Sequence, residues 1–209
     1  MTHMYPIIGM SPGNSYFKDE VVKELLKKVI EKYGKTAILI ADIPAVSTYI
    51  ALGYQENRAR RDKALPHSNN LRNKVQKAMV ELGCSKDQIK IIDWGLEIEN
   101  NITYKEKYKE VLEFYNSNKN FQQAANNATQ GVLEYSGKEI TNVVSAVKIA
   151  VHYLLSEFAF MEFAPEFLQT EKVKYIYHKK WPVYESYIAG EFDGRIRDYL
   201  EFEIITVTL

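Results

Sequence analysis

A serine close to the start of the chain lies in a turn that could present its hydroxyl for chemistry. The apolar run 5–8 is typical of a buried strand, it ends at Gly9, and Ser11 follows two residues later. Residues 12–14 read Pro-Gly-Asn, which is a turn-forming sequence. A hydroxyl on a tight turn at the end of a core strand is a frequent position for a covalent nucleophile. The competing interpretation is a solvated serine in an ordinary turn.

Gly9 to Gly13 also spells G-x-S-x-G, the nucleophile-elbow pattern of many hydrolases. In such an elbow the backbone N–H of the residue after the serine helps to stabilise the oxyanion. That residue is Pro12 here, which has no N–H. Ser11 also stands almost at the N-terminus, whereas the hydrolase motif lies deep in its chain. The pattern therefore disfavours a hydrolase elbow.

Tyr153 and Glu157 lie four residues apart in a strongly apolar helical segment, so their side chains share one helix face. A carboxylate in apolar surroundings is costly unless it meets a cation or hydrogen-bond donors. The spacing indicates one of two arrangements. Glu157 is either a helix-edge glutamate that reaches solvent, or a carboxylate that holds a substrate ammonium group with help from the Tyr153 phenol.

Tyr177 and His178 end a strand-like run, 173–177. If this strand is parallel to the strand before Ser11, both carboxyl ends open on one crevice, which is where open α/β sheets bind ligands. A core aromatic is the alternative interpretation of Tyr177.

A basic segment, 55–77, holds seven basic and two acidic residues, a net charge of +5 in a chain with 27 basic and 27 acidic residues. It is either a solvated helix face or a phosphate-binding patch that steers a structured RNA by backbone contacts. Residues 72, 74 and 77 lie off the apolar stripe of their helix, which predicts that they face solvent. The candidate RNA contacts are Arg58, Arg60, Arg61, Lys63, Arg72, Lys74 and Lys77.

Length and composition exclude several classes of protein. The 209 residues, 46% hydrophobic, suffice for one substantial domain over 1–209. Cys84 is the single cysteine, and no Cys/His spacing suggests zinc. There is no signal peptide, no run of 18 apolar residues and no glycine-rich nucleotide motif. We expect a cytoplasmic protein without metal, cofactor or membrane contact.

The elements that must position these residues follow from periodicity. A helix over 18–33 separates two strand-like runs, and that is a βαβ unit. Longer helical regions are predicted over 44–83, with an interruption near Pro66, and over 97–134. Residues 136–139 resemble a capping box that opens a long helix to about residue 163. The predicted fold is α/β, with a Rossmann-like parallel sheet flanked by helices. The predicted strands are 7–10, 36–41, 88–93, 174–177 and 203–208.

Taken in order, these motifs resemble those of the cyclodipeptide synthase family, over about residues 5–185. The opening run 9–17 is similar to the family's serine motif. Residues 51–54 and 71–74 resemble its basic helix, and Tyr153-x-x-x-Glu157 followed by Tyr177-His178 resembles its second signature. The combination of Asn14, Tyr177 and His178 resembles the subfamily named for Asn, Tyr and His. One departure is Gly13, where the family often has a larger, aromatic residue.

The resemblance implies the fold of the catalytic domain of class I aminoacyl-tRNA synthetases of the tyrosyl and tryptophanyl type. The HIGH and KMSKS signatures that those enzymes use for ATP are absent. The implied reaction joins two amino acids from two aminoacyl-tRNAs into a 2,5-diketopiperazine. ATP, cofactor and metal are not required because the ester is already activated. We expect a monomer.

The implied mechanism is ping-pong, through aminoacyl and dipeptidyl esters of Ser11. By resemblance, Glu157 and Tyr153 hold the ammonium group and Tyr177 positions Ser11. The base that deprotonates Ser11 stays open. None of His3, His67, His152 and His178 is placed for it by the sequence, and the family allows the terminal ribose hydroxyl of the tRNA to take part.

Further substrate-binding residues are expected near the motifs. Asn14 and His178 belong to the motifs themselves, and Lys179 and Pro182 are candidates for the second pocket. Lys179 could favour an acidic second amino acid by charge pairing. The candidates for the first amino-acid pocket are Ile7, Gly9, Phe160 and Tyr175.

Two other functions remain open. An aminoacyl-tRNA hydrolase would use the same serine with water as the second acceptor and release free amino acid. A non-catalytic tRNA-binding module on this fold would keep its activity in Ser11→Ala.

Overall fold

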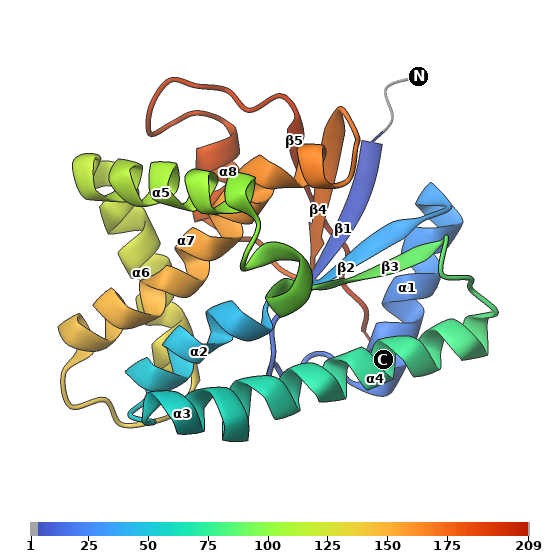
Figure 1. The fold of residues 1–209 in the computed structure, drawn as a ribbon, viewed down its shortest axis with the longest axis horizontal. Helices are drawn as coiled ribbons and strands as arrows, with labels where there is room; N and C mark the ends of the chain where they lie inside the picture. Colours follow the sequence, from blue (N-terminus) through green and yellow to red (C-terminus); the bar gives the residue numbers. More distant parts are fainter. Residues whose placement is uncertain (1–3, 209) are drawn as a thin grey trace.

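The computed structural model describes residues 4–208, and its centre is a sheet of five parallel strands (Figure 1). The strand order is β3-β2-β1-β4-β5, so the chain starts in the middle, builds outward to β3 and crosses back to β4 and β5. This order confirms the predicted Rossmann-like fold, and its switch point lies between β1 and β4. The strands are β1 (Met4–Met10), β2 (Thr36–Ile40), β3 (Ile89–Asp93), β4 (Lys172–Tyr177) and β5 (Leu200–Ile204).

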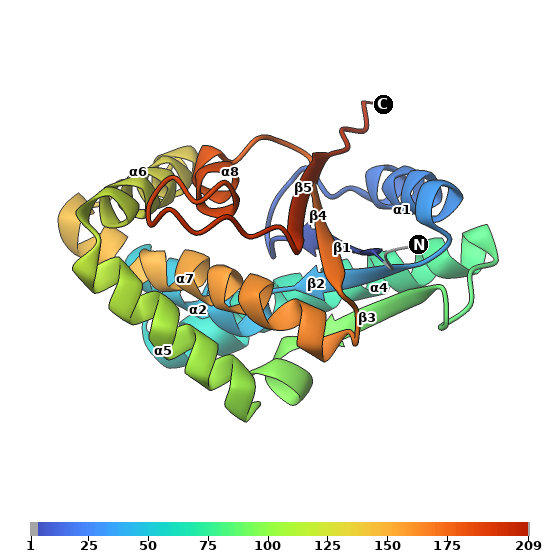
Figure 2. The same ribbon diagram turned by 90° about the horizontal axis from the view of Figure 1, so that it is seen from above.

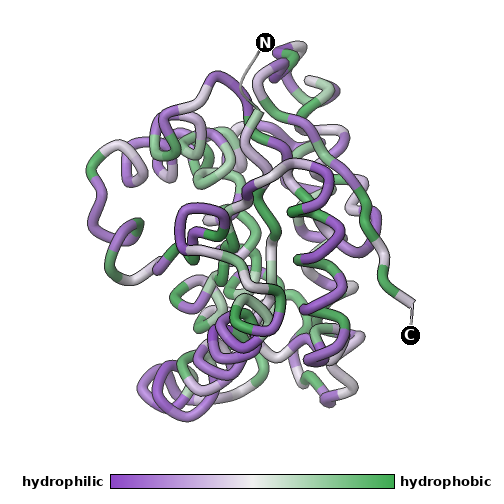
Figure 3. Tube along the Cα trace, turned by 90° about the vertical axis from the view of Figure 1, so that its right-hand side faces the viewer, coloured by the Kyte–Doolittle hydropathy of each residue, from purple (hydrophilic) through white to green (hydrophobic). Residues whose placement is uncertain are grey.

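Helices cover both faces of the sheet and enclose two separate cores (Figure 2). Because neighbouring strand residues point to opposite faces, Ile7 joins one core and Ile8 the other. One core is covered by α1 (Asp19–Tyr33) and α4 (Leu65–Leu82). The other is covered by α5 (Ile102–Ser117), α6 (Lys119–Tyr135), α7 (Val143–Phe167) and α8 (Pro182–Ile188). The central strands are mainly hydrophobic in Figure 3, and the outer helices and loops carry most hydrophilic segments.

Shorter elements complete the chain. The helix α2 (Asp42–Ala51) follows β2 and packs on α7. The short α3 (Glu56–Arg58) and the π-helical η1 (Ala59–Ala64) lead directly into α4, and a second π-helical segment, η2 (Trp94–Ile98), follows β3. The break expected near Pro66 is therefore a change of helix type, with the proline in the first turn of α4, where its missing N–H is harmless.

The helix α7 is the central helix of the larger core. By length and composition alone, α7 could cross a membrane. The sequence did not predict such a helix, because it has no uninterrupted run of 18 apolar residues. Half of the most apolar window of α7 is buried inside the protein, and α7 packs against α2, α5 and α6. The apolar surface of α7 is thus a core surface.

Three predicted boundaries were wrong for local reasons. Ser136 opens no helix: its hydroxyl donates to the Leu133 carbonyl at the end of α6, and Asn142 caps α7 by accepting from the Ser145 N–H. The helical region 97–134 is two helices that meet at Asn118, whose side chain caps α6. The last strand is 200–204 rather than 203–208, because the final residues leave the sheet and Val207 hydrogen-bonds to Tyr16.

Candidate active site

Ser11 stands in a tight turn directly after β1. The Asn14 N–H donates to the Ser11 carbonyl at 3.2 Å, and Gly13 has a φ of 79°. With Pro12 before the glycine, this is the geometry of a type II turn, which requires positive φ at its third position. A Cβ at Gly13 would lie 2.6 Å from the Tyr49 hydroxyl. Tyr49 on α2 thus occupies the space over the turn, which accounts for a glycine where the family often has a larger residue.

Two phenols hold the Ser11 hydroxyl. Its Oγ lies 2.9 Å from the Tyr177 Oη, and the Tyr153 hydroxyl donates to it at 3.3 Å. Tyr177 reaches the serine because β4 pairs with β1 in parallel, as predicted. Its ring passes over Gly9, where a Cβ would lie 3.5 Å from the Tyr177 Cδ2. Tyr153 comes from α7 on the same side of the sheet.

Glu157 lies one helical turn beyond Tyr153 and is surrounded by phenols. The Tyr184 hydroxyl donates to its Oε2. Burial raises the Glu157 pKa to about 7, although hydrogen bonds from Tyr184 and Tyr153 oppose that rise. Within residues 4–208, no lysine or arginine forms an ion pair with this carboxylate. A buried carboxylate with donors but no cation is suited to a ligand that brings its own positive charge.

The two phenols at Ser11 are neutral near pH 7. Burial raises the Tyr177 pKa to about 12, even though hydrogen bonds to Ser11 and Asn14 lower it. Burial and the neighbouring Glu157 charge raise the Tyr153 pKa well above its usual value. Both side chains are therefore suited to orient the serine by hydrogen bonds, and neither is a phenolate near pH 7.

No histidine in the described part of the chain hydrogen-bonds to Ser11. His152 lies on α7 beside Tyr153, but its Nδ1 is 2.6 Å from the Tyr108 hydroxyl on α5. His67 stacks on Tyr49 next to the turn. His178 stacks on Tyr16 with ring centroids 4.0 Å apart, and burial lowers its pKa to about 4. His3 lies outside the described residues.

The structure brings the residues expected for the first pocket together behind Ser11. Ile7 pairs in register with Tyr175, and the Tyr175 and Phe160 ring centroids are 6.4 Å apart. The candidates for the second pocket lie outside this cluster. Lys179 is exposed with its Nζ 4.6 Å from the Trp181 ring centroid, and Pro182 is exposed in the first turn of α8. Asn14 shapes the turn by accepting the Tyr16 N–H.

The basic segment divides into an exposed part and an inward-facing part. Arg58, Arg60 and Arg61 are exposed on α3 and η1, and Lys63 lies over the Tyr54 ring. Lys77 is also exposed and pairs with Asp19 at 3.0 Å.

The prediction that Arg72 and Lys74 face solvent was wrong. Arg72 approaches Asp93 at 3.4 Å and Asp42 at 3.6 Å, and Lys74 donates to the Phe17 carbonyl at 2.8 Å. The reason is that α4 crosses beneath the carboxyl ends of the strands (Figure 1), where Asp93 ends β3 and Asp42 opens α2 just after β2.

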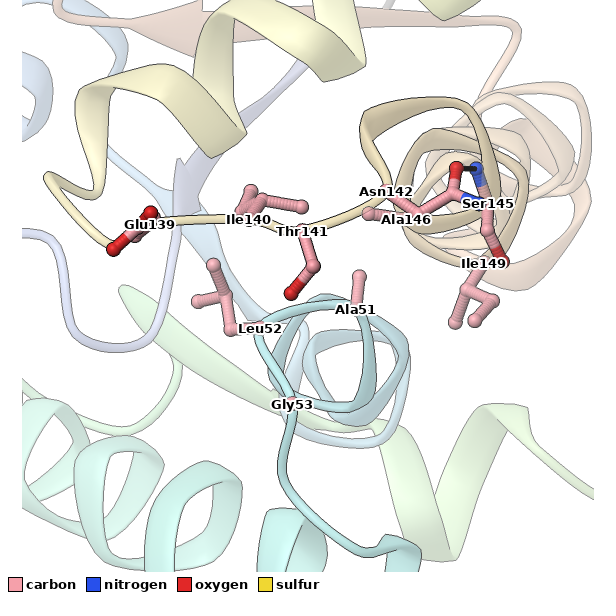
Figure 4. A pocket seen from close by; sticks show the side chains of 10 residues that line it. All are labelled: Ala51, Leu52, Gly53, Glu139, Ile140, Thr141, Asn142, Ser145, Ala146 and Ile149. Atoms are coloured by element: carbon pink, nitrogen blue, oxygen red, sulfur yellow. Dashed lines mark hydrogen bonds between the residues drawn. The ribbon is translucent and has the colours of Figure 1, made fainter.

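Two hollows lie away from Ser11. One of about 230 Å³ lies between the end of α2 and the segment before α7, lined by Leu52, Thr141 and Ile149 among others (Figure 4). The other, of about 520 Å³, lies between α2, α5 and α7 and includes Trp94 and His152. Within residues 4–208, no group of three His, Cys, Asp or Glu side chains is arranged to hold a metal ion.

Sequence reasoning missed Tyr184 and Tyr49. Tyr184 enters the site from α8, 27 residues after the carboxylate that it contacts. Tyr49 enters from α2 and covers Gly13. No fixed spacing relates either tyrosine to its partner, so the only available signal was the position of each residue in a short helix that follows a strand of the sheet.

Comparison with known proteins assigns the chain to a family. The profile of the family described as cyclodipeptide synthase matches residues 2–207. A cyclo(L-leucyl-L-leucyl) synthase of Staphylococcus haemolyticus is 20% identical over 205 residues, which is 96% of this chain and 86% of that protein. The chain therefore belongs to the cyclodipeptide synthase family, and it is an enzyme of that family.

Solved structures agree in fold. A Mycobacterium tuberculosis protein, described as showing that cyclodipeptide synthetases are related to type I tRNA synthetases, superposes with a TM-score of 0.81 at 20% identity, over 98% of this chain and 86% of that one. A cyclodipeptide synthase from Candidatus Glomeribacter gigasporarum, bound to Phe-tRNAPhe, gives a TM-score of 0.69 at 15% identity, over 99% and 89%. The predicted kinship with class I synthetases is thus confirmed at the level of fold.

Proposed function

We propose that this enzyme makes a 2,5-diketopiperazine from two aminoacyl-tRNAs by a ping-pong route through esters of Ser11. One observation carries the proposal. The Ser11 hydroxyl is held between the Tyr177 and Tyr153 phenols, and the same helix face places the cation-free carboxylate of Glu157 one turn further on. A nucleophile and an ammonium site side by side are what an aminoacyl ester requires.

In the first half-reaction the Ser11 Oγ attacks the acyl carbon of the first aminoacyl-tRNA. A new ester bond forms, the bond to the terminal ribose oxygen breaks, and the serine proton passes to that departing oxygen. Tyr177 and Tyr153 orient the hydroxyl for this attack. The neighbouring ribose hydroxyl of the tRNA relays the proton, because no histidine of residues 4–208 hydrogen-bonds to Ser11.

Glu157 holds the ammonium group of the acyl-enzyme. Charge pairing in a buried site is strong because solvent screens it little. In the second half-reaction the amine must lose a proton before it attacks the second ester. A carboxylate with a pKa raised to about 7 is suited to take that proton. The dipeptidyl ester then closes when its new terminal amine attacks the Ser11 ester, which releases the ring and restores the serine.

The exposed part of the basic segment is our candidate for tRNA contact. His67, on the first turns of α4, lies 3.7 Å from where a Gly13 Cβ would stand, so this segment borders the Ser11 turn. The exposed arginines of this segment would bind acceptor-stem phosphates while the acylated end reaches Ser11. The related enzyme bound to Phe-tRNAPhe supports tRNA as the acyl donor.

The remaining assignments are part of the same proposal. Residues 1–209 act as one catalytic domain, in the cytoplasm where charged tRNA is available. His178 belongs to the substrate site, Lys179 and Pro182 border the second amino acid, and Lys179 selects an acidic one by charge pairing. Recovery of only neutral, apolar products from mixed charged tRNA would rule out the role of Lys179.

Product analysis tests the proposal. The purified protein is incubated with mixed aminoacyl-tRNAs, and diketopiperazines and free amino acids are measured by mass spectrometry beside Ser11→Ala. We expect a cyclic dipeptide from the wild type and none from the variant. Free amino acid without cyclic product would indicate a hydrolase instead, and neither product from the wild type would indicate a non-catalytic tRNA-binding module. Equal cyclic product from Ser11→Ala would remove Ser11 from the mechanism.

A further inference from the structure

The phenol of Tyr175 is buried without a hydrogen-bond partner. The residue is 7% exposed, and its Oη contacts no donor or acceptor within residues 4–208. The other phenols around Glu157 all have partners: Tyr153 and Tyr177 bond to Ser11, and Tyr184 bonds to Glu157. Because buried polar groups are almost always bonded, this unpaired hydroxyl is a candidate contact for a ligand.

Its position relates it to the acyl group on Ser11. Tyr175 lies two residues before Tyr177 on β4, so the two side chains point to the same face of the sheet. Tyr175 is about 7 Å closer to the amino end of the strand. Phe160, three residues after Glu157 on α7, packs edge-on against it. An acyl group bonded to Ser11, with its ammonium at Glu157, would extend its side chain along β4 toward this phenol.

We propose that Tyr175 hydrogen-bonds the side chain of the first amino acid, and that the enzyme selects an acyl group with a polar N–H or O–H donor: a hydroxyl or an amide. An apolar side chain of equal shape would leave the hydroxyl unpaired, and sites built around a hydrogen bond reject such analogues strongly. The negative field of Glu157, which also reaches Tyr175, disfavours a carboxylate side chain. This inference rests on the proposed function.

Matched acyl groups on a single tRNA test it. One tRNA is charged with asparagine or leucine, and with threonine or valine, so that only the polarity of the side chain changes within each pair. The readout is the rate at which the acyl group appears on the intact protein by mass spectrometry. We expect the wild type to load the polar member of at least one pair ten or more times faster, and Tyr175→Phe to bring that ratio to about one.

A matched control separates hydrogen bonding from packing. Tyr115 is a buried tyrosine on α5 that bonds to Asn126, remote from Ser11, so Tyr115→Phe should keep the wild-type ratio. Tyr175→Phe should unfold at no lower temperature than the wild type, since it removes a hydroxyl that has no partner.

Two results would overturn the inference while the proposed function stands: equal loading of both members of each pair by the wild type, or an unchanged ratio in Tyr175→Phe. The first comparison needs no variant, so it decides the matter even if Tyr175→Phe does not fold. If no charged tRNA gives an adduct or a cyclic product, the proposed function has failed and the inference fails with it.

Discussion

Two buried carboxylates on α7, five residues apart, have opposite surroundings. Glu162 accepts from the Arg197 Nε at 2.7 Å and from the hydroxyls of Tyr187 and Tyr199. Burial alone would raise its pKa, but these donors outweigh burial and lower it. Glu157 has phenols and, among the residues that the structure describes, no arginine partner, and burial raises its pKa to about 7. The same residue type on the same helix is thus stabilised at one position and left uncompensated at the other.

The difference between the two carboxylates indicates a structural role for Glu162 and a ligand-binding role for Glu157. Arg197 is buried and also donates to the Tyr187 carbonyl and to Asp193, so the Glu162 cluster fixes the segment between α8 and β5. The charge of Glu162 is balanced by Arg197 without any ligand. The Glu157 cluster lacks one positive charge beside the Ser11 hydroxyl, and an amino-acid ester carries that charge. The enzyme therefore keeps an unfavourable carboxylate where the proposed substrate neutralises it.

The largest effect on stability is expected in the Glu162 cluster. Glu162→Ala leaves the buried Arg197 guanidinium with Asp193 as its remaining carboxylate partner and should lower the free energy of unfolding by about 3 kcal/mol. Denaturant titration of the variant and the wild type measures this loss. The folded fraction should still form product at the wild-type rate. A loss below about 1 kcal/mol would show that Glu162 is not a structural carboxylate.

The pH dependence of stability should distinguish the two clusters. The folded pKa of Glu157, about 7, exceeds the usual 4.5, so the folded state binds a proton between these values that the unfolded state lacks. Stability from this group is therefore lost as pH rises from 4.5 to 7, by up to about 3 kcal/mol. Glu157→Gln should lack this loss and should become more stable than the wild type near pH 7. The measurement is the free energy of unfolding of both proteins as a function of pH. Parallel curves for the wild type and Glu157→Gln would contradict the raised pKa of Glu157.

The pH dependence of stability expected from Glu162 has the opposite sign to that from Glu157. Its folded pKa is lowered, so its contribution to stability is present above the usual pKa and is lost as pH falls through the folded value. Acid unfolding should therefore begin at Glu162 and its neighbours. Glu162→Gln should flatten the acid limb of the stability curve and leave the limb between pH 4.5 and 7 unchanged.

Removal of the Glu157 charge should impair catalysis more than folding. Glu157→Gln keeps the shape but loses the charge-assisted contact to the ammonium group, so product formation should fall by roughly a hundredfold. The measurement is the rate of diketopiperazine formation at saturating aminoacyl-tRNA. Glu162→Gln, corrected for its folded fraction, is the control on the same helix. A wild-type rate in Glu157→Gln would remove the ammonium site from the mechanism.

The smallest effect concerns tRNA binding. Arg60 is exposed, so Arg60→Ala should lower the slope of log affinity against log salt by roughly one unit without changing stability. Arg72 pairs with Asp42 and Asp93 inside the chain, so Arg72→Ala should lower stability and leave the salt slope nearly intact. If Arg72→Ala changes the slope and Arg60→Ala does not, the inward-facing half of the segment is the RNA contact.

The sequence predicted what local spacing and sheet topology control. The i, i+4 rule placed Tyr153 and Glu157 on one face, and the parallel-sheet rule brought Tyr177 to Ser11. Contacts between distant segments were not predictable in this way. Arg72 turns inward because it pairs with Asp42 at the start of α2 and with Asp93 at the end of β3, and helix periodicity reveals neither partner.

Two local sequence patterns compete for the N-terminus of α7. Ser136 has the pattern of a capping residue, but Asn142 lies closer to the first apolar turn of α7 and forms the cap instead. The unpaired hydroxyl of Tyr175 shows a similar limit, because a strand pattern predicts a buried aromatic and says nothing about its hydrogen bonds.

The most direct test of the account is the mass of the protein after brief mixing with one aminoacyl-tRNA, followed by peptide mapping. We predict that the wild type gains the mass of one aminoacyl group, located on Ser11, and that Ser11→Ala gains nothing. An adduct at another residue, or cyclic product formed at the wild-type rate by Ser11→Ala, would contradict the central claim that Ser11 accepts the acyl group.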